Sequence, residues 1–315
     1  MNLIPEETVF VFPGQGSQSV GMGKALAEAF PLARETFAEA DELLGFPLSR
    51  LMWEGPEAEL NDTVNTQPAL FVHSLAVYRV FSALWPNFRP LAMAGHSLGE
   101  LSAVTAAGSL SFAEGLRLAR RRGELMKEAG ERSPGGMAAI LGLDIPTLEQ
   151  ICEKASLPGE TVQVANDNCP GQVVISGARA ALERAMEAAK AAGARRVIPL
   201  AVSIAAHSQL MASAQQGFNE ALERLSFKNP QVPVIGNVQA QVLDSAEAVR
   251  ADLAAQLTHR VRWVESVALL IRMGGRTFLE MGNGNVLAGL IRRIDGTVQA
   301  YSLSSPADFE ALGAL

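Results

Sequence analysis

The chain has 315 residues, of which 48% are hydrophobic and 19% are charged, so it can bury a large core and lacks the composition of a disordered protein. Its formal net charge of −7 argues against a general nucleic-acid-binding protein, whose surface would be basic. Arg, Glu or Pro interrupts every long apolar run, so we expect no membrane span. The cysteines Cys152 and Cys169 fit neither a disulfide framework nor a metal-ligand spacing. With no basic leader at the N-terminus, the expected location is the reducing cytoplasm.

The first part of the chain predicts a buried strand followed by a long helix. Residues 8–12 form a short apolar run that ends at the glycine-rich loop "FPGQGSQSVGMG", residues 12–23. Helical periodicity continues over residues 22–44, where Pro31 predicts a kink or a break.

A second long helix is predicted over residues 63–85, opening near Pro68, where proline is tolerated in the first turn. It is followed by a strand over residues 90–95, a Gly-x-Ser-x-Gly turn and two further helices, the second over residues 111–130. Strands that alternate with helices predict a mainly parallel sheet covered by helices, the α/β class.

The pattern changes after residues 131–136, where a compact unit is predicted. Its strands and helices follow the order βαββαβ, which is the ferredoxin-like unit. The predicted segments are, in order, residues 136–143, 144–156, 161–167, 171–177, 178–193 and 194–202. We therefore predict an insertion of residues 135–202 within a larger α/β subdomain made of residues 1–134 and 203–315.

The larger subdomain is predicted to resume with a helix that starts near His207. A strand over residues 232–239 follows, then two helices, and then strands over residues 276–282 and 297–302.

The stretch "GHSLG", residues 95–99, has the form of a nucleophile elbow, because it lies between a predicted strand and a predicted helix. Gly95 and Gly99 supply the small residues that such a turn requires. The start of the helix offers N–H groups to a developing oxyanion, and the loop of residues 12–23 can supply a second donor. We interpret Ser97 as a nucleophile; the alternative is a serine that caps the helix.

The chain contains four histidines, and each is a candidate for the base of Ser97. His207 follows a predicted strand, and the loops at strand ends are where α/β folds place their sites. His73 lies in an apolar helical run and His96 on the turn itself, so both are expected to be structural, and His259 is expected to be exposed. The position therefore favours His207 as the base.

An acid to complete a triad is missing from the expected place. A hydrolase of this type has Ser, then Asp or Glu, then His in chain order. The aspartates between Ser97 and His207 are Asp144 and Asp167, and both lie in the predicted insertion. We therefore predict a dyad whose histidine is oriented by a backbone carbonyl.

Three consecutive arginines, residues 120–122, occupy the middle of the predicted helix over residues 111–130. Consecutive helical positions point in different directions, so the three cannot share one face. An arginine that points inward needs an anion, and its planar fork suits two-point contact with a carboxylate. The alternative is a fully solvated basic patch.

Together these stretches resemble a known family. The motifs are "FPGQGSQSVGMG", "TQPALF", "GHSLGELSA", "RRGELM", "GGMAAILGL", "NDNCPGQVVISG", "AAHSQLM" and "VRWVESV", in this order. They are similar to those of the malonyl-CoA:acyl carrier protein transacylases of bacterial fatty acid synthesis and of the related acyltransferase domains of polyketide synthases. The resemblance implies a hydrolase-like large subdomain with a ferredoxin-like insertion.

The resemblance also implies roles for individual residues. Ser97 would be acylated, His207 would be its base, and the N–H groups of Gln15 and Leu98 would form the oxyanion hole. Arg122 would bind the free carboxylate of the malonyl group. The remaining implied positions are the acyl-pocket residues Gln67, Met126, Asn166 and Ala206, and Arg262, whose backbone carbonyl would orient the histidine.

The implied activity is transfer of a malonyl group from malonyl-CoA to the phosphopantetheine thiol of acyl carrier protein, through a malonyl-serine ester and without a metal or redox cofactor. Candidate residues for docking the carrier protein are the basic residues Lys190, Arg195, Arg196, Arg292 and Arg293. The alternatives are a malonyltransferase of a polyketide pathway or of malonate decarboxylase, a serine hydrolase of acyl thioesters, and a non-catalytic module that binds the carrier protein.

Overall fold

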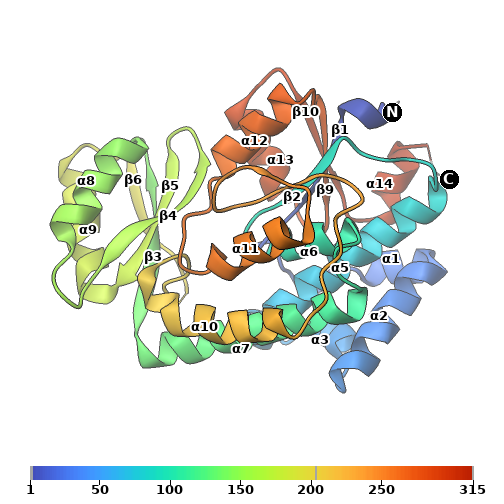
Figure 1. The fold of residues 1–315 in the computed structure, drawn as a ribbon, viewed down its shortest axis with the longest axis horizontal. Coiled ribbons are helices and arrows are strands. Elements are labelled where there is room, and N and C mark those ends of the chain that lie inside the picture. Colours follow the sequence, from blue (N-terminus) through green and yellow to red (C-terminus); the bar gives the residue numbers. More distant parts are fainter. Residues whose placement is uncertain (1–2, 203, 314–315) are drawn as a thin grey trace.

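The computed structural model describes residues 3–202 and 204–313, which contain two β-sheets (Figure 1). The larger sheet has the strand order β10-β9-β1-β2-β7-β8, and every pairing in it is parallel except that of β7 with β8. This confirms the predicted α/β class with a mainly parallel sheet. Its strands are β1 (Thr8–Phe12), β2 (Ala92–Gly95), β7 (Val234–Ile235), β8 (Val242–Leu243), β9 (Thr277–Met281) and β10 (Gln299–Leu303).

Helices cover both faces of the larger sheet. They are η1 (Pro5–Glu7), α1 (Lys24–Ala29), α2 (Pro31–Leu44), α3 (Leu48–Glu54), α4 (Glu57–Leu60), α5 (Thr63–Leu84), α6 (Leu98–Ala106), α7 (Phe112–Arg132), η2 (Gln209–Met211), α10 (Ala212–Glu223), α11 (Ala246–Gln256), α12 (Trp263–Arg272), α13 (Val286–Ile294) and α14 (Pro306–Ala311). None of the helices in the described part of the chain is long and apolar enough to cross a membrane.

The central strand β1 shows how the two faces are built. All five of its residues are buried, as expected for a strand covered on both sides. Because side chains alternate along a strand, Phe10 and Phe12 join the core that contains α5, α6 and α7. Val9 and Val11 join the opposite core, which contains α12 and α13.

The long helices differ from the prediction in one respect. The predicted break at Pro31 is present, because α1 ends at Ala29 and α2 begins at Pro31. The prediction that the next helix opens near Pro68 is wrong, because α5 begins at Thr63 and contains Pro68. Proline has no N–H to donate four residues back, and the carbonyl of Val64 instead accepts a hydrogen bond from Arg120 Nη1 at 3.2 Å. A partner from α7 thus satisfies the acceptor that the proline leaves free.

The smaller sheet has the order β4-β5-β3-β6 with antiparallel pairing throughout, which is the ferredoxin-like arrangement (Figure 1). Its helices α8 and α9 pack on one face around a separate core. The elements are β3 (Gly135–Leu141), α8 (Ile145–Ala155), β4 (Val162–Cys169), β5 (Gln172–Ala178), α9 (Arg179–Ala191) and β6 (Arg196–Pro199). The predicted ferredoxin-like unit is confirmed. The predicted boundaries stay a prediction, and Ser203, where the larger part would resume, lies outside the described residues, as do residues 1–2 and 314–315.

Several elements differ from the sequence interpretation in extent. Strand β6 ends at Pro199, whereas the prediction continued it to residue 202. His207 does not start a helix; it lies in an irregular stretch before η2 and has a φ of +57°. The short helices α3 and α4 and the helix α13 between β9 and β10 were absent from the prediction.

The turn between β2 and α6 depends on two glycines. A Cβ at Gly95 would lie 1.9 Å from the carbonyl carbon of Gly99, and a Cβ at Gly99 would lie 1.9 Å from the carbonyl oxygen of Phe12. Ser97 between them has φ +54° and ψ −110°, a backbone conformation that residues other than glycine rarely adopt. This close packing of the turn against β1 explains why the motif needs both glycines.

The Gly95→Ala substitution is expected to destabilise the fold by about 4 kcal/mol or more, because backbone rather than side-chain atoms occupy the space. The matched control is Gly289→Ala in α13, where a Cβ meets nothing within 4 Å and alanine stabilises a helix by about 0.5–1 kcal/mol. Denaturant unfolding measures both. Equal stability of the two variants would contradict this account of the turn.

Candidate active site

Ser97 and His207 form a hydrogen-bonded pair. Ser97 Oγ lies 2.7 Å from His207 Nε2, although the residues belong to distant parts of the chain. His207 Nδ1 lies 3.0 Å from the carbonyl oxygen of Gln256 and 3.1 Å from that of His259. Because carbonyl oxygens only accept, Nδ1 carries the proton and Nε2 is left free to accept the hydroxyl proton of Ser97. This is the arrangement that a general base requires.

The prediction that the Arg262 carbonyl orients the histidine is wrong. The Arg262 carbonyl instead accepts hydrogen bonds from the backbone N–H and the hydroxyl of Ser266, both at 2.9 Å, because it begins helix α12. The carbonyls that contact His207 come from the end of α11 and the turn after it, where Gln256 and His259 lie.

Arg122 is the arginine of residues 120–122 that points inward. Its side chain is 2% exposed, whereas Arg120 and Arg121 are paired with Glu124 near the surface. Arg122 Nη2 lies 3.1 Å from Ser97 Oγ. The other atoms that the Arg122 guanidinium contacts are uncharged: Gln67 Oε1 at 2.9 Å, Gln256 Oε1 at 2.8 Å and Met126 Sδ at 3.4 Å. A guanidinium held this close to Ser97 can receive an anionic group that enters the site.

The buried surroundings set the charges of the two groups. Burial lowers the pKa of His207 to about 3, and the nearby positive charge of Arg122 adds to this effect. Burial lowers the pKa of Arg122 to about 10, which leaves it charged at neutral pH. The site therefore combines a neutral base with a fixed cation.

A cavity of about 480 Å³ opens onto these residues. The predicted site residues that line it are Gln15, Ser97, Arg122, Met126, Asn166, Ala206 and His207. Gln67 lies behind the lining and contacts it through Arg122 and Met126. Leu98 is buried directly after Ser97, at the start of α6. Arg262 lines a different, smaller cavity.

Gln15 and Leu98, whose N–H groups are the predicted oxyanion hole, belong to the loop after β1 and to the start of α6. Gln15 lines the cavity through the loop after β1, and the hydrogen bond of 2.8 Å from Thr63 Oγ1 to its Oε1 holds its side chain away. Leu98 provides the first N–H of α6, where the helix dipole favours negative charge. Within residues 3–202 and 204–313, neither N–H donates a hydrogen bond to another residue.

The other histidines have structural surroundings. His73 is buried in α5, where its Nε2 contacts the carbonyl of Ser304 at 3.2 Å and burial lowers its pKa to about 4. His96 packs edge-on against Trp263, and its Nε2 lies 2.8 Å from Asn168 Oδ1. The side chain of His259 is exposed. No group of three or more His, Cys, Asp or Glu that could hold a metal occurs in the described residues.

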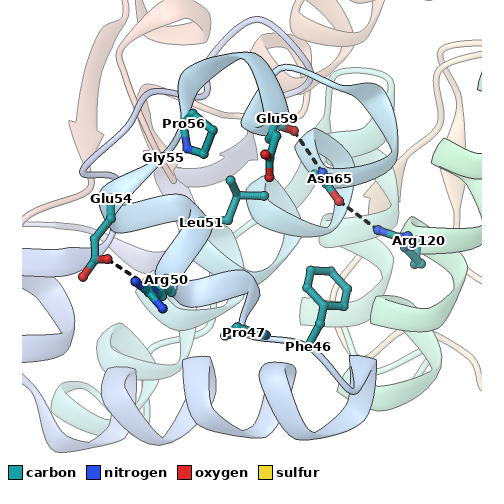
Figure 2. A pocket seen from close by; sticks show the side chains of 10 residues that line it. All are labelled: Phe46, Pro47, Arg50, Leu51, Glu54, Gly55, Pro56, Glu59, Asn65 and Arg120. Carbon is teal, nitrogen blue, oxygen red and sulfur yellow. Dashed lines mark hydrogen bonds and ion pairs between the residues drawn. The ribbon is translucent and has the colours of Figure 1, made fainter.

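A second cavity, of about 740 Å³, lies between α3, α4, α5 and α7 (Figure 2). Both of its arginines are already paired with carboxylates: Arg50 with Glu54 at 3.0 Å, and Arg120 with Glu124 at 2.8 Å. Asn65 bridges the backbone of Glu59 and the side chain of Arg120. Because its arginines already have acidic partners, this cavity offers little to an anionic ligand.

Sequence reasoning missed the polar residues beneath the elbow, which are Asn237, Gln256, Glu100 and Asp252. Asn237 Oδ1 accepts from the Ser97 N–H at 2.8 Å, and Gln256 Nε2 donates to the Ser97 carbonyl at 3.0 Å. The sequence contained a feature that could have indicated two of these residues. Asn237 is a polar residue inside the predicted strand over residues 232–239, and Glu100 is the only acid in the apolar helix "LGELSAVTA".

The chain is similar to known proteins over nearly its whole length. A family model described as an acyl transferase domain matches residues 9–297. The chain is 46% identical over 303 residues to the malonyl CoA-acyl carrier protein transacylase of Bacillus subtilis, covering 96% of this chain and 94% of that protein.

Solved structures give the same picture. An acyl carrier protein S-malonyltransferase from Vibrio cholerae superposes with a TM-score of 0.94 at 42% identity, covering 97% of this chain and 99% of that one. A malonyl-transacylase solved in complex with a type II polyketide synthase acyl carrier protein superposes with a TM-score of 0.94 at 45% identity, covering 97% and 98%.

Acylation of Ser97 is expected to remain fast as the pH falls through 6.5, the ordinary pKa of histidine, because the base His207 stays neutral down to its lowered pKa of about 3. Single-turnover acylation measured between pH 8 and pH 4 tests this. The lowered pKa also makes the fold less stable below pH 6.5, because His207 binds a proton there in the unfolded chain but not in the folded one. Circular dichroism must therefore confirm that the protein is folded at each pH. Half-loss of the rate near pH 6.5 in folded protein would contradict a depressed pKa.

Proposed function

The chain belongs to the acyl transferase family, and we propose that it transfers a malonyl group from malonyl-CoA to the phosphopantetheine thiol of an acyl carrier protein of fatty acid synthesis. The observation that carries this proposal is the guanidinium of Arg122, buried 3.1 Å from the nucleophile Ser97. The partners of Arg122 in the described residues are neutral, so an acyl group with a free carboxylate supplies the missing anion. Malonyl has that carboxylate.

The first half-reaction loads Ser97. The carboxylate of the malonyl group binds Arg122, which places the thioester carbonyl next to Ser97 Oγ. His207 Nε2 takes the hydroxyl proton while Oγ attacks the carbonyl carbon. The carbon–sulfur bond then breaks, and the CoA thiolate leaves with the proton that His207 returns. The product is a malonyl-serine ester.

The second half-reaction is the same chemistry in reverse order. The phosphopantetheine thiol gives its proton to His207 and attacks the ester carbonyl. The bond to Ser97 Oγ breaks, and the serine oxygen recovers its proton from His207. The carbonyls of Gln256 and His259 hold the imidazole in the tautomer that both halves need.

Both half-reactions place negative charge on the carbonyl oxygen of the acyl group. We assign its stabilisation to the N–H groups of Gln15, in the loop after β1, and of Leu98, at the start of α6. Arg122 has a different role, because its charge is directed at the far carboxylate. We assign Gln67, Met126, Asn166 and Ala206 to the acyl pocket, the first two because they fix the Arg122 fork.

Among the candidate docking residues, Arg293 is favoured by its position. Its Nη1 donates to Gln172 Oε1 at 2.5 Å, and Gln172 lines the cavity that contains Ser97. Lys190 is paired instead with Glu187 at 2.7 Å on α9. We also propose a cytoplasmic location; both cysteines are free, as is usual in a reducing compartment.

The Arg122→Ala variant is expected to lose about 2–5 kcal/mol of transition-state stabilisation with malonyl-CoA, the scale for removing one partner of a buried charged pair. Acetyl-CoA has no free carboxylate, so the specificity constant for acetyl-CoA should fall far less. The control is Arg121→Ala, one position away but 45% exposed and paired with Glu124 and Glu128. Specificity constants for the two donors measure the effect. Equal losses for both donors with Arg122→Ala would show that Arg122 does not bind the acyl carboxylate.

A further inference from the structure

Two buried carboxyl groups beneath the elbow have no role in the chemistry described so far. Glu100, in the first turn of α6, is fully buried, and Asp252, in α11, is 5% exposed. Neither belongs to an ion pair in the described part of the chain. Glu100 Oε2 and Asp252 Oδ2 both accept the backbone N–H of Asn237, at 3.2 Å and 3.1 Å, so the two carboxyls lie side by side. Two buried carboxylates this close repel each other, which favours a proton on one of them.

The donors around each group show which one is protonated. Asp252 Oδ2 accepts the backbone N–H groups of Asn237 at 3.1 Å and Val238 at 3.3 Å, and such donors stabilise a carboxylate. Glu100 Oε1 is completely buried, and no donor within residues 3–202 and 204–313 reaches it. A proton on Glu100 turns this unsatisfied acceptor into a donor. Burial and the neighbouring Asp252 also raise the pKa of Glu100 well above its ordinary value.

The other oxygen of Glu100 connects the two residues that hold Ser97. Glu100 Oε2 accepts from Gln256 Nε2 at 2.7 Å and from the Asn237 N–H at 3.2 Å. Asn237 in turn bonds the Ser97 N–H and, through Nδ2, the Gly95 carbonyl at 2.7 Å.

Gln256 extends the same network to the rest of the site. Its side chain bonds the Ser97 carbonyl and Arg122, and its backbone carbonyl contacts His207. Ser97, His207 and Arg122 are thus each two hydrogen bonds away from Glu100.

We propose that Glu100 is a neutral carboxylic acid that donates to an ionised Asp252, and that this pair is a positioning element for Ser97, His207 and Arg122. Asn237 and Gln256 then hold the strained elbow through their hydrogen bonds to Ser97, and both residues donate to the same oxygen of Glu100. The neutral state of Glu100 also matters for Arg122, because an ionised Glu100 would partly neutralise the charge that the acyl carboxylate needs. This second consequence rests on the proposed function, whereas the positioning of Ser97 does not.

Three variants test the proposal through the rate at which phenylmethylsulfonyl fluoride, a small neutral reagent, modifies Ser97. Glu100→Gln keeps the shape, accepts through its amide oxygen and donates through its amide nitrogen, so its rate should stay close to wild type. Glu100→Leu cannot hold Asn237 or Gln256, and a misplaced nucleophile should react about a hundredfold more slowly. Phe309→Leu, in the core between α1 and α14, controls for lost stability without contact to the elbow.

Kinetics with malonyl-CoA supply the second readout. Glu100→Leu should lower kcat by about a hundredfold with little change in KM, while Phe309→Leu leaves kcat near wild type at equal loss of thermal stability. Wild-type reactivity of Glu100→Leu would show that the pair positions nothing. A Glu100→Gln rate as low as that of Glu100→Leu would show that the site needs a charged Glu100.

Infrared difference spectroscopy keeps the proposal testable if Glu100→Leu does not fold. At neutral pH, the wild-type spectrum minus that of Glu100→Gln should contain the carbonyl band of a protonated carboxylic acid. A carboxylate band in its place would overturn the neutral state of Glu100. Neither the infrared nor the reagent experiment involves an acyl donor, so both outcomes stand even if malonyl-CoA proves not to be the substrate.

Discussion

The hydrogen bond between Ser97 Oγ and His207 Nε2, at 2.7 Å, is the contact on which the site depends. Both residues hold left-handed backbone conformations, with φ of +54° and +57°. Each such conformation costs on the order of 1–3 kcal/mol and persists only where the surroundings fix it. For Ser97, the fixing groups are the two glycines packed on β1 and the side chains of Asn237 and Gln256. For His207, they are the carbonyls of Gln256 and His259.

Gln256 connects the two sides of this contact. Its backbone orients the base, and its side chain reaches both the nucleophile and the arginine. Because one residue at the end of α11 serves all three groups, a small shift of α11 would change the geometry of the whole site. The elbow follows β2 of the larger sheet, whereas the base is oriented by a carbonyl at the end of α11, which packs against α10 and β8. Chemistry at Ser97 therefore depends on segments that lie far apart in the sequence.

Local patterns were enough to predict the elbow and the ferredoxin-like unit, because each depends on residues close together in sequence. They left open whether any arginine of residues 120–122 points inward, and only the family resemblance singled out Arg122. The histidine-orienting carbonyl was assigned wrongly to Arg262, because every residue has a carbonyl and only the folded chain shows which one faces Nδ1. The start of α5 was missed for a similar reason. Pro68 is tolerated inside that helix only because Arg120, from α7, satisfies the freed carbonyl of Val64.

Under the proposed function, Arg122 explains why this elbow serves transfer of a particular acyl group. A buried guanidinium held by the amides of Gln67 and Gln256 keeps its full charge, since neither neutralises it. Binding a carboxylate there uses interaction energy to place the thioester on Ser97. The proposed substrate thus supplies the negative charge that the neutral partners of Arg122 in the described residues do not provide.

The central claim, that Ser97 carries the malonyl group between two thiols, is tested most directly by intact mass spectrometry. After mixing with malonyl-CoA alone, the account predicts one malonyl adduct per chain that persists in water and is absent from Ser97→Ala. Adding phosphopantetheinylated acyl carrier protein should then remove the adduct and place the malonyl group on the carrier. Rapid loss of the adduct as free malonate before the carrier is added, or an adduct on Ser97→Ala, would contradict the account.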